Sequence, residues 1–476
     1  MISPKWTTDY GLFGYFARKA SIWPPLNLAI LAAIAEKEGH EVRIIDGEAE
    51  DVSQSQMIQE VLVWKPDIIG MTIATPFYHI AVELAVGIKL AASHIPIVIG
   101  GAHITALREE ALDSSFDYGF IGEADYSWPV FLNLYERGKA ISGVKGIIYR
   151  DNGEVRFPGE AVPVEDLDTV PLPARHLLKM DKYYIGTMRG NKNFTSIMFT
   201  RGCPFSCIFC STQVSGKRLR KKSVRLLIDE IKSVISDFGI RHFYFADDNL
   251  TIDRNYTLEM CDLIEQENLN ITFDGSTRAN LVDEELISRL AKCGLIRLSF
   301  GLESVNSEVR RIMRKEVPLD AYEKANKLVN KYDIECLNSV MIGMPGDTAE
   351  TIQETLDYLR QAREIKQANC SIAMPYPGTE LLEMAKRGDH GLKLETDNFA
   401  SFRRYGSGVL SVGNLSSSDL IKLQNKAFVS IYAAPWRWKP MIKKSGIIGG
   451  LLTLSRVIKS LINIASDSLG KNKSSQ

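Results

Sequence analysis

The chain has 476 residues, more than one hydrophobic core normally serves, so two or three domains are expected. A hydrophobic content of 45%, a charged content of 24% and a formal net charge of -1 describe an ordinary globular protein and exclude a globally basic nucleic-acid-binding surface. Seven cysteines, three of them clustered, do not make a disulfide framework, and we expect a cytoplasmic protein with no signal peptide and no membrane-spanning run.

Residues 1–140 alternate strand-like and helix-like runs. The expected strands are residues 41–46, 67–74, 95–101 and 118–123, and the expected helices are residues 52–64 and 77–93. Apolar strands separated by helices predict an α/β domain with a doubly wound, Rossmann-like parallel sheet. Ligands of such sheets bind beyond the carboxyl ends of the strands. The residues at those ends, where a large ligand can approach the backbone closely, are Thr72, Thr75, Gly100, Gly101, His103, Gly122 and Glu123.

Residues 141–189 are predicted to be a hairpin followed by a linker. Residues 146–157 place turn residues between two strand-like runs, which is typical of a hairpin. Residues 162–173 are acidic and contain prolines, which indicates a connection between domains.

Residues 190–390 contain six strand-like runs with helices between them. The strands are residues 195–200, 242–246, 271–275, 296–301, 336–342 and 371–374, and the helices are residues 224–238, 256–267, 283–292, 322–332 and 349–364. This alternation predicts a partial (β/α)6 barrel, whose site lies at the carboxyl ends of the strands. The polar residues at these ends include Asp247, Asp248, Ser276, Arg278, Glu303 and Ser304.

The most informative stretch is the loop after the first barrel strand, which holds Cys203, Cys207 and Cys210 in the spacing Cys-x3-Cys-x2-Cys. A [4Fe-4S] cluster usually takes four thiolates, so three leave one iron with an open position. Zinc is the alternative, but a structural zinc site usually takes four ligands as two separated pairs. The other four cysteines are isolated in apolar runs and are expected to be buried.

Residues 391–476 are predicted to form a helical C-terminal region. Residues 420–432 have helical periodicity. The last 40 residues carry eight basic side chains against one acidic one, with apolar residues at helical spacing between 447 and 462. Such a basic amphipathic tail either lies on an anionic membrane or packs on its own domain. A second basic stretch, residues 216–225, is either a solvated loop or a docking patch for an acidic partner.

The cysteine loop, with the aromatic Phe209 before its third cysteine, resembles the signature of the radical S-adenosylmethionine (SAM) enzymes. Four runs in the first domain resemble the cobalamin-binding domain of the cobalamin-dependent members of that family; they are residues 24–28, 38–42, 100–103 and 122–125. The resemblance implies that residues 1–140 bind cobalamin and that residues 190–390 bind a [4Fe-4S] cluster and SAM. The three cysteines would then hold the cluster.

The same resemblance implies roles for the polar strand ends. Asp247 or Asp248 would hold the SAM amino group, and Arg278 or Ser276 its carboxylate, since a guanidinium matches a carboxylate in shape and charge. Glu303 and Ser304 would hold the ribose, and Phe209 would lie near the adenine. For each of them, ordinary turn chemistry is the alternative.

The chain departs from the family in two places. It lacks the Asp-x-His-x-x-Gly loop by which some cobalamin domains supply a histidine to cobalt, so the lower axial position is either empty or filled by water or another side chain. His103 is one candidate, although a histidine at a strand end more often forms hydrogen bonds. The first apolar strand is almost missing, so either the fold tolerates a stub or the true start lies upstream.

The implied reaction begins with reductive cleavage of SAM to a 5'-deoxyadenosyl radical, which removes a hydrogen atom from the substrate. Methyl transfer from methylcobalamin to an unactivated carbon is the outcome that the resemblance favours. A radical oxidation or cyclisation of a tetrapyrrole-like or lipid substrate is the alternative. A non-catalytic cobalamin carrier or sensor would not need the cysteine loop, and methylthiotransferases carry further cysteines before Cys203 that this chain lacks.

The expected partners follow from this chemistry. They are a small-molecule substrate, either a lipid or a tetrapyrrole, and a one-electron reductase such as flavodoxin or ferredoxin. No nucleic acid is expected. If the basic tail lies on a membrane instead of packing on its own domain, peripheral contact with a membrane surface is also expected.

Overall fold

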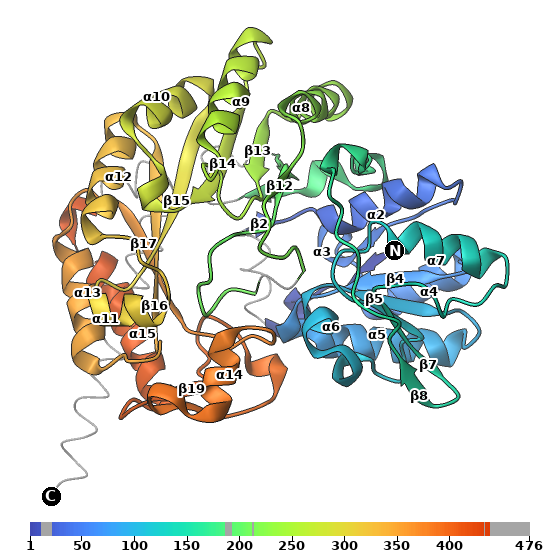
Figure 1. Ribbon diagram of the computed structural model, residues 1–476. Coiled ribbons are helices and arrows are strands. Elements are labelled where there is room, and N and C mark those ends of the chain that lie inside the picture. The colour runs from blue at the N-terminus through green and yellow to red at the C-terminus, as the bar shows by residue number, and fades with distance from the viewer. Residues whose placement is uncertain (11–20, 186–192, 212–213, 433, 438–476) are drawn as a thin grey trace, which may run out of the picture.

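The computed structural model describes residues 1–10, 21–185, 193–211, 214–432 and 434–437. Two sheets lie side by side, a mostly parallel one in the first third of the chain and a parallel one in the middle (Figure 1). The predicted α/β class, with a doubly wound sheet followed by a partial barrel, is confirmed.

The first sheet has seven strands in the order β3-β1-β4-β5-β6-β7-β8. Their bounds are β1 Ile2–Ser3, β3 Ile45–Asp46, β4 Ile69–Thr72, β5 Ile97–Gly100, β6 Tyr118–Phe120, β7 Ile147–Asp151 and β8 Glu154–Arg156. The two-residue β1 lies between β3 and β4, where Ile2 pairs in parallel with Ile45 and Met71. The first strand of this structure is thus a two-residue stub inside the sheet. Because β1 offers only two residues to pair with, β3 is shorter than the predicted strand 41–46.

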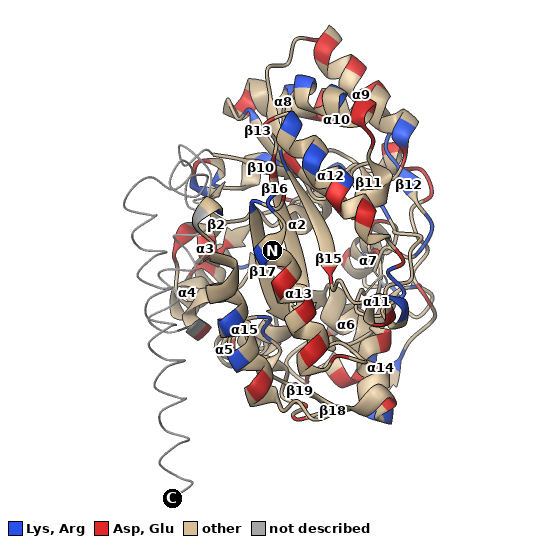
Figure 2. Ribbon diagram, turned by 90° about the vertical axis from the view of Figure 1, so that its left-hand side faces the viewer, with Lys and Arg blue, Asp and Glu red and all other residues tan. Residues whose placement is uncertain are grey.

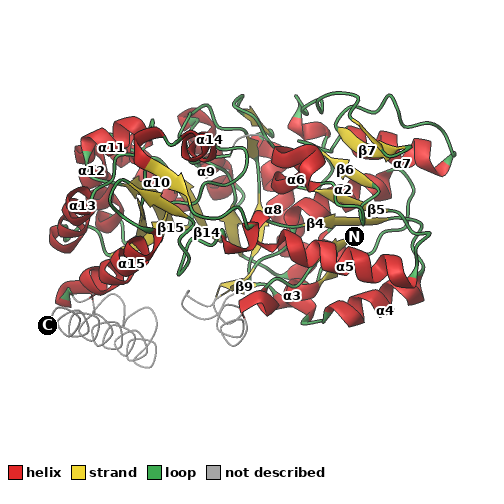
Figure 3. Ribbon diagram, turned by 90° about the horizontal axis from the view of Figure 1, so that it is seen from below, coloured by secondary structure: helices red, strands yellow, loops and turns green. Residues whose placement is uncertain are grey.

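Helices cover both faces of this sheet, as its alternating burial requires. They are α2 Leu26–Lys37, α3 Gly47–Glu50, α4 Gln54–Trp64, α5 Tyr78–Ala91, α6 Ala102–Leu107 and α7 Ser127–Glu136. In β5, Val98 packs into a core with α2 and α7, whereas Ile97 and Ile99 pack into the core with α4 and α5. Figure 3 shows α4 and α5 along one side of the strands. The opposite face, which carries Val98, and the helix α2 together shape the ligand site described below.

The predicted hairpin forms and belongs to the first domain. β7 pairs antiparallel with β6, and β8 pairs antiparallel with β7, so the hairpin extends the first sheet. The hairpin part of the predicted segment 141–189 is therefore joined to the first sheet, and the predicted linker, residues 162–173, follows it. Further along, β9 (Tyr184–Ile185) pairs antiparallel with β2 (Ser21–Ile22), which ties the end of the connection back to the first domain.

The second sheet contains six parallel strands in the order β10-β13-β14-β15-β16-β17, as predicted. Their bounds are β10 Thr195–Ile197, β13 His242–Phe245, β14 Thr272–Thr277, β15 Leu295–Glu303, β16 Glu335–Ile342 and β17 Gln367–Ile372. The predicted strand 195–200 is divided, because Asp247 accepts hydrogen bonds from the backbone nitrogens of Phe199 and Thr200. The chain leaves the sheet there and continues as β11 (Thr200–Arg201), which pairs antiparallel with β12 (Arg220–Lys221).

Helices line the outside of the second sheet. They are α8 Val224–Phe238, α9 Arg254–Gln266, α10 Glu284–Cys293, α11 Ser307–Ile312, α12 Leu319–Lys331, α13 Ala349–Gln361 and α14 Glu380–Arg387. The side chains of Ser223, Asp253 and Asp283 cap the first turns of α8, α9 and α10. α11 and α14 are additions to the predicted set. The six residues of α11 lie directly after the end of β15, so this helix helps to shape the sheet's carboxyl end.

The C-terminal region closes one edge of the barrel. The antiparallel pair β18 (Leu392–Leu394) and β19 (Leu410–Val412) precedes α15 (Ser417–Tyr432). Gln424 and Tyr432 of α15 donate hydrogen bonds to the carbonyls of Cys370 and Ala368 in the last strand. The predicted tail helix falls outside the described residues. None of the described helices has the length and apolar character needed to span a bilayer.

The linker is anchored to the barrel by a buried ionic triad. Arg175 donates to the Glu230 carboxylate at 2.7 Å and to the Ser196 carbonyl at 2.7 Å. Lys222 contributes a second ion pair to Glu230 at 2.8 Å. All three charged side chains are at least nine-tenths buried. The triad therefore fixes the connection and the base of α8 to the start of β10.

We expect Glu230→Gln to lower stability by roughly 3–5 kcal/mol, because it leaves two buried cations without a matching charge. Burial raises the pKa of Glu230, but the opposite effect of Arg175 and Lys222 is larger, so the pKa lies below its ordinary value of 4.5. The carboxylate's contribution is therefore present above about pH 4.5 and is lost as the pH falls through the lower, folded-state pKa. Urea unfolding of the wild-type protein and of Glu230→Gln should show a difference in the free energy of unfolding at pH 7, and this difference should become smaller in acid. Glu267→Gln, which removes a surface carboxylate paired with Arg225 and Lys232, is the matched control; an equally small loss in both variants would contradict the prediction.

Candidate functional site

The cysteine loop runs from β11 to β12 and folds tightly against its own second half. Gly202 adopts φ +90°, and a Cβ atom there would lie 2.2 Å from the carbonyl oxygen of Arg218. Only glycine therefore permits this crossing. The antiparallel pairing of β11 with β12 closes the loop at its base.

The three thiols line one cavity of about 400 Å³ at the carboxyl ends of the barrel strands. The Asn249 amide donates to the Cys203 sulfur at 3.6 Å, and the Arg278 guanidinium donates to the Cys207 sulfur at 3.7 Å. Burial raises the pKa of Cys203 and raises that of Cys210 to about 11. Both thiols are therefore protonated at neutral pH unless a cation binds them.

The arrangement of these thiols suits a cluster better than a single ion. Within the described ranges, no group of three or more His, Cys, Asp or Glu side chains is close enough to hold one metal ion. The thiolates of an iron–sulfur cluster bind different iron atoms, so they are spaced more widely than the ligands of one zinc ion. Three thiols that share a cavity without meeting at one point fit that donor set.

Five of the seven residues predicted to contact SAM line the same cavity: Phe209, Asp248, Ser276, Arg278 and Glu303. Asp247 and Ser304 do not. The Asp247 carboxylate accepts from the backbone of Phe199 and Thr200, and burial raises its pKa to about 7. The Ser304 hydroxyl lies 3.4 Å from that of Thr355 and accepts from the Asn306 backbone. These two residues stabilise the strand ends instead of facing the cavity.

Glu303 is held in an unusual conformation. Its φ is 62°, which a non-glycine residue rarely adopts, and the pairing of β15 with β16 shifts register between Gly301 and Glu303. The Glu303 carboxylate accepts from Lys315 at 2.7 Å, and both side chains are about nine-tenths buried. Backbone strain of this kind collects at functional sites. Lys315 also lies 5.7 Å from the centre of the Phe209 ring.

Arg278 has unused hydrogen-bonding capacity inside the cavity. Its guanidinium stacks on Phe205 at 3.8 Å from the ring centre. Its Nε atom is buried and meets no acceptor among the described residues. An orphaned donor of this kind is costly unless a ligand satisfies it. An anionic ligand in this cavity would therefore stabilise Arg278.

A second cavity, of about 410 Å³, lies between the two domains. Five of the residues predicted to bind cobalamin line it: Thr72, Gly100, Gly101, Gly122 and Glu123. The helix α2 contributes Leu28 and Leu31, and the barrel contributes Met198 and Arg201. The wall is mostly apolar, and its glycines let a large flat ligand approach the ends of β5 and β6.

Thr75 and His103 do not line this cavity. The His103 Nδ1 atom lies 3.3 Å from the Thr75 hydroxyl, and its ring packs against Tyr78 and Phe399. Burial lowers the pKa of His103 to about 4, so the imidazole is neutral at pH 7. The structure therefore does not bring the predicted candidate for the cobalt ligand to the interdomain cavity.

The basic stretch 216–225 is largely neutralised by carboxylates. Arg218, Arg220, Lys221, Lys222 and Arg225 each form an ion pair with an acidic residue. Figure 2 shows acidic and basic residues interspersed over α8, α9 and α10. Of the two alternatives for this stretch, a solvated loop or a docking patch, these contacts do not favour the docking patch. They also show that Arg220 and Lys222 are buried rather than solvated.

Several lining residues were missed from the sequence. Asn249 belongs to the strand end that also holds Asp247 and Asp248, but it was given no role there. Lys315 had no local signal, because it reaches Glu303 from twelve residues further along the chain. Ser339 and Asn369 pair in register on β16 and β17 and add neutral polar groups to the cavity.

Comparisons with known proteins match both domains. The radical SAM superfamily matches residues 197–359, and the B12 binding domain matches residues 14–131. A protein of Pyrococcus horikoshii named as an uncharacterised methyltransferase is 30% identical over 93% of this chain and 94% of its own length. The anaerobic magnesium-protoporphyrin IX monomethyl ester cyclase of Rubrivivax gelatinosus is 28% identical over 81% of this chain and 70% of its own. Among solved structures, the radical SAM methyltransferase TsrM of Kitasatospora setae, with cobalamin and a [4Fe-4S] cluster bound, covers 93% of this chain and 97% of its own at 15% identity and a TM-score of 0.72.

Proposed function

We propose that this chain, which belongs to the B12-binding radical SAM enzymes, transfers a methyl group to an unactivated carbon atom of a small molecule. When bound, the cluster supplies the electron that cleaves SAM to a 5'-deoxyadenosyl radical, and methylcobalamin supplies the methyl group. The protein's own part is to hold these groups next to one another and to exclude water.

The observation that carries the proposal is the position of the two cavities on either side of one chain segment. Arg201 lines the interdomain cavity, and Cys203, two residues later, lines the barrel cavity. Ala246 and Asp248 repeat this division at the end of β13. A substrate at the barrel mouth would thus lie near both sites. A non-catalytic cobalamin carrier would have no use for the barrel cavity with its three cysteines.

The lining residues suggest how SAM is held. We assign Cys203, Cys207 and Cys210 to the cluster. We assign Asp248 to the SAM ammonium group and Arg278 to the carboxylate, which is supported by their place in the cavity and by the orphaned Nε donor of Arg278. We assign Glu303, which pairs with Lys315, to the ribose and Phe209 to the adenine, since both line the same cavity.

Arg278→Lys is expected to weaken SAM binding by about tenfold or more, because an ammonium cannot form the two-pronged contact of a guanidinium. Equilibrium dialysis of the reconstituted protein with SAM would measure this. Iron analysis must accompany it, since Arg278 also contacts Cys207. Arg289→Lys, on the outer face of α10, is the control. Unchanged affinity at normal iron content would remove Arg278 from the SAM site.

Tetrapyrrole cyclisation is the second candidate, and the Rubrivivax relative favours it. The experiment that separates the two is anaerobic reconstitution with iron, sulfide and hydroxocobalamin, followed by SAM and a strong reductant. Methyl transfer predicts both 5'-deoxyadenosine and cobalamin-dependent S-adenosylhomocysteine, since SAM must also give up a methyl group. 5'-Deoxyadenosine alone would favour cyclisation or oxidation. If a protein with a complete cluster forms neither 5'-deoxyadenosine nor S-adenosylhomocysteine, the proposal is overturned.

A further inference from the structure

Two arginines stand opposite each other at the base of the cysteine loop. Arg201 of β11 and Arg220 of β12 are direct partners in the antiparallel ladder. Like charges in directly opposed positions destabilise a strand pair. Here both side chains are also more than nine-tenths buried, which removes the screening that water would provide. The loop can close in this way only if other groups neutralise both charges.

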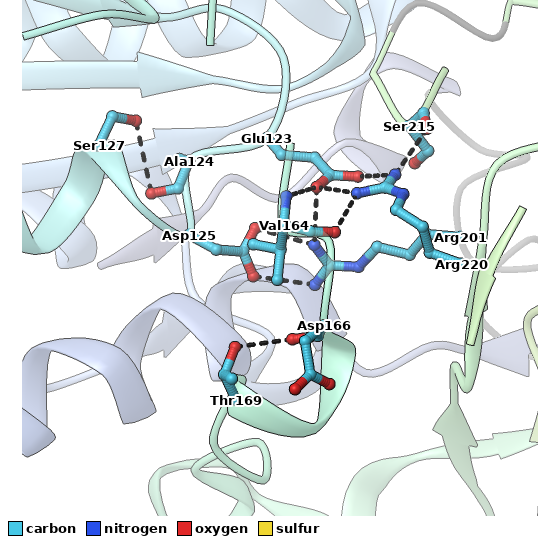
Figure 4. Close-up of polar contacts among 10 residues, drawn as sticks. All are labelled: Glu123, Ala124, Asp125, Ser127, Val164, Asp166, Thr169, Arg201, Ser215 and Arg220. Atoms are coloured by element: carbon cyan, nitrogen blue, oxygen red, sulfur yellow. Dashed lines mark hydrogen bonds and ion pairs between the residues drawn. The ribbon is translucent and has the colours of Figure 1, made fainter. Parts of the chain in front are cut away.

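The neutralising groups come from the first domain. The Arg201 guanidinium donates two hydrogen bonds to Asp125, each of 2.9 Å. Arg220 donates to the two carboxylate oxygens of Glu123, at 2.6 and 2.8 Å. Figure 4 shows the two acids and the two arginines facing one another. Both acids lie in the turn after β6, which also forms the wall of the interdomain cavity.

The linker takes part in the same cluster. Glu123 accepts from the Val164 backbone nitrogen, and Arg220 donates to the Val164 carbonyl at 2.7 Å. Arg220 also donates to the Ser215 carbonyl inside the loop (Figure 4). The turn after β6, the linker and both ends of the cysteine loop thus meet at one buried point. We call Glu123, Asp125, Arg201 and Arg220 the interdomain clamp.

We propose that the interdomain clamp makes closure of the cysteine loop depend on the first domain, so that its four residues are positioning residues for the cluster and for cobalamin. The proposal rests on the proposed function only for the identity of the bound groups, which are the cluster in the loop and cobalamin in the interdomain cavity. Glu123 then acts through Arg220 and also through Arg201, with which it forms an ion pair at 3.4 Å, and Asp125 acts through Arg201. This differs from the direct cofactor contact expected of Glu123 from the sequence.

The test is amide hydrogen exchange over residues 202–211 in cluster-free, full-length protein. Glu123→Gln combined with Asp125→Asn should accelerate exchange there by about tenfold or more, because the opposed arginines lose their counter-charges. Exchange in α9 and α10 should not change. Arg218→Gln is the matched control, because Arg218 lies in the same loop and its exposed ion pair with Glu165 of the linker is lost in this variant. Equal exchange in the control and the double variant would overturn the proposal.

A second measurement uses the reconstituted holoprotein and does not depend on turnover. Iron release to a chelator should be about tenfold faster in the double variant than in Arg218→Gln. The magnetic interaction between Co(II) cobalamin and the reduced cluster should also become weaker or more heterogeneous. Unchanged release and an unchanged interaction would contradict a positioning role. If even the wild-type chain assembles no cluster, the proposed function fails, whereas the exchange experiment still decides on the clamp.

A charge exchange keeps the test decisive if the double variant folds poorly. Asp125→Arg alone places three cations together and should open the loop. Combining it with Arg201→Asp restores one opposed pair and should return exchange over residues 202–211 toward the wild-type rate. Absence of any rescue, in a protein whose α9 and α10 exchange normally, would show that the charges do not hold the loop.

Discussion

Cys207→Ala should abolish formation of 5'-deoxyadenosine, lowering its rate by at least about three orders of magnitude, because the reaction depends entirely on the bound cofactor. Cys207 lines the barrel cavity and lies within hydrogen-bonding distance of Arg278. Two thiolates cannot hold a [4Fe-4S] cluster in the way that three can. Iron and sulfide should therefore be lost together with turnover. Anaerobic reconstitution with metal analysis and mass spectrometry of the nucleoside measures both.

Cys261→Ala is the control for this prediction. Cys261 is a buried thiol of α9 whose sulfur lies 3.1 Å from that of Cys293, and neither lines the barrel cavity. The variant should keep its iron, its sulfide and its activity. An active Cys207→Ala enzyme would remove the loop from the site. Zinc without iron or sulfide in the wild-type protein would instead favour the zinc alternative.

The sequence was most informative where periodicity and burial determine structure. Both sheets, and helix α8 with its exact bounds, follow from apolar runs that alternate with amphipathic ones. The predicted strand 195–200 was interrupted because the side chain of Asp247, almost fifty residues later, binds the backbone of Thr200. No local pattern carries such a contact.

The same limit applies to the residues predicted to bind SAM. Asp247 and Asp248 are neighbours after the end of β13, but only Asp248 lines the cavity, because the Asp247 carboxylate is held by the backbone of Phe199 and Thr200. Glu303 lines the cavity and Ser304 does not, since the Ser304 hydroxyl contacts Thr355 and the Asn306 backbone. Strand-end position selects such a pair of residues, but contacts with other segments decide which member lines the cavity.

The charges of the basic stretch show a related limit. A run of lysine and arginine suggests a surface patch when read alone. Arg220 instead pairs with Glu123, which is buried and distant in sequence, and Lys222 pairs with the buried Glu230 of α8. Local charge runs therefore predict partners only when their counter-charges are known. The interdomain clamp could not have been predicted from its two acids in the first domain or from its two arginines in the cysteine loop alone.

Gly100→Leu should weaken cobalamin binding by roughly tenfold to a hundredfold, because it fills the interdomain cavity from its floor. Gly100 ends β5 and lines this cavity, on the same face as Val98. A Cβ atom there would meet only the Cβ of Phe120, at an ordinary contact distance of 3.9 Å, so the strand can accept a side chain. The added atoms must then occupy ligand space. Titration of the protein with hydroxocobalamin, followed by its absorption spectrum, measures the loss.

The cluster separates this effect from misfolding. Gly100 is not among the residues lining the barrel cavity, so the Gly100→Leu protein should still assemble iron and sulfide and cleave SAM. Gly143→Leu, at an exposed turn where a Cβ meets nothing within 4 Å, should bind cobalamin normally. Loss of the cluster along with cobalamin would indicate general damage. Full cobalamin affinity in Gly100→Leu would mean that cobalamin does not bind in the interdomain cavity. Transfer of a methyl group across the segment between Arg201 and Cys203 would then have no structural basis.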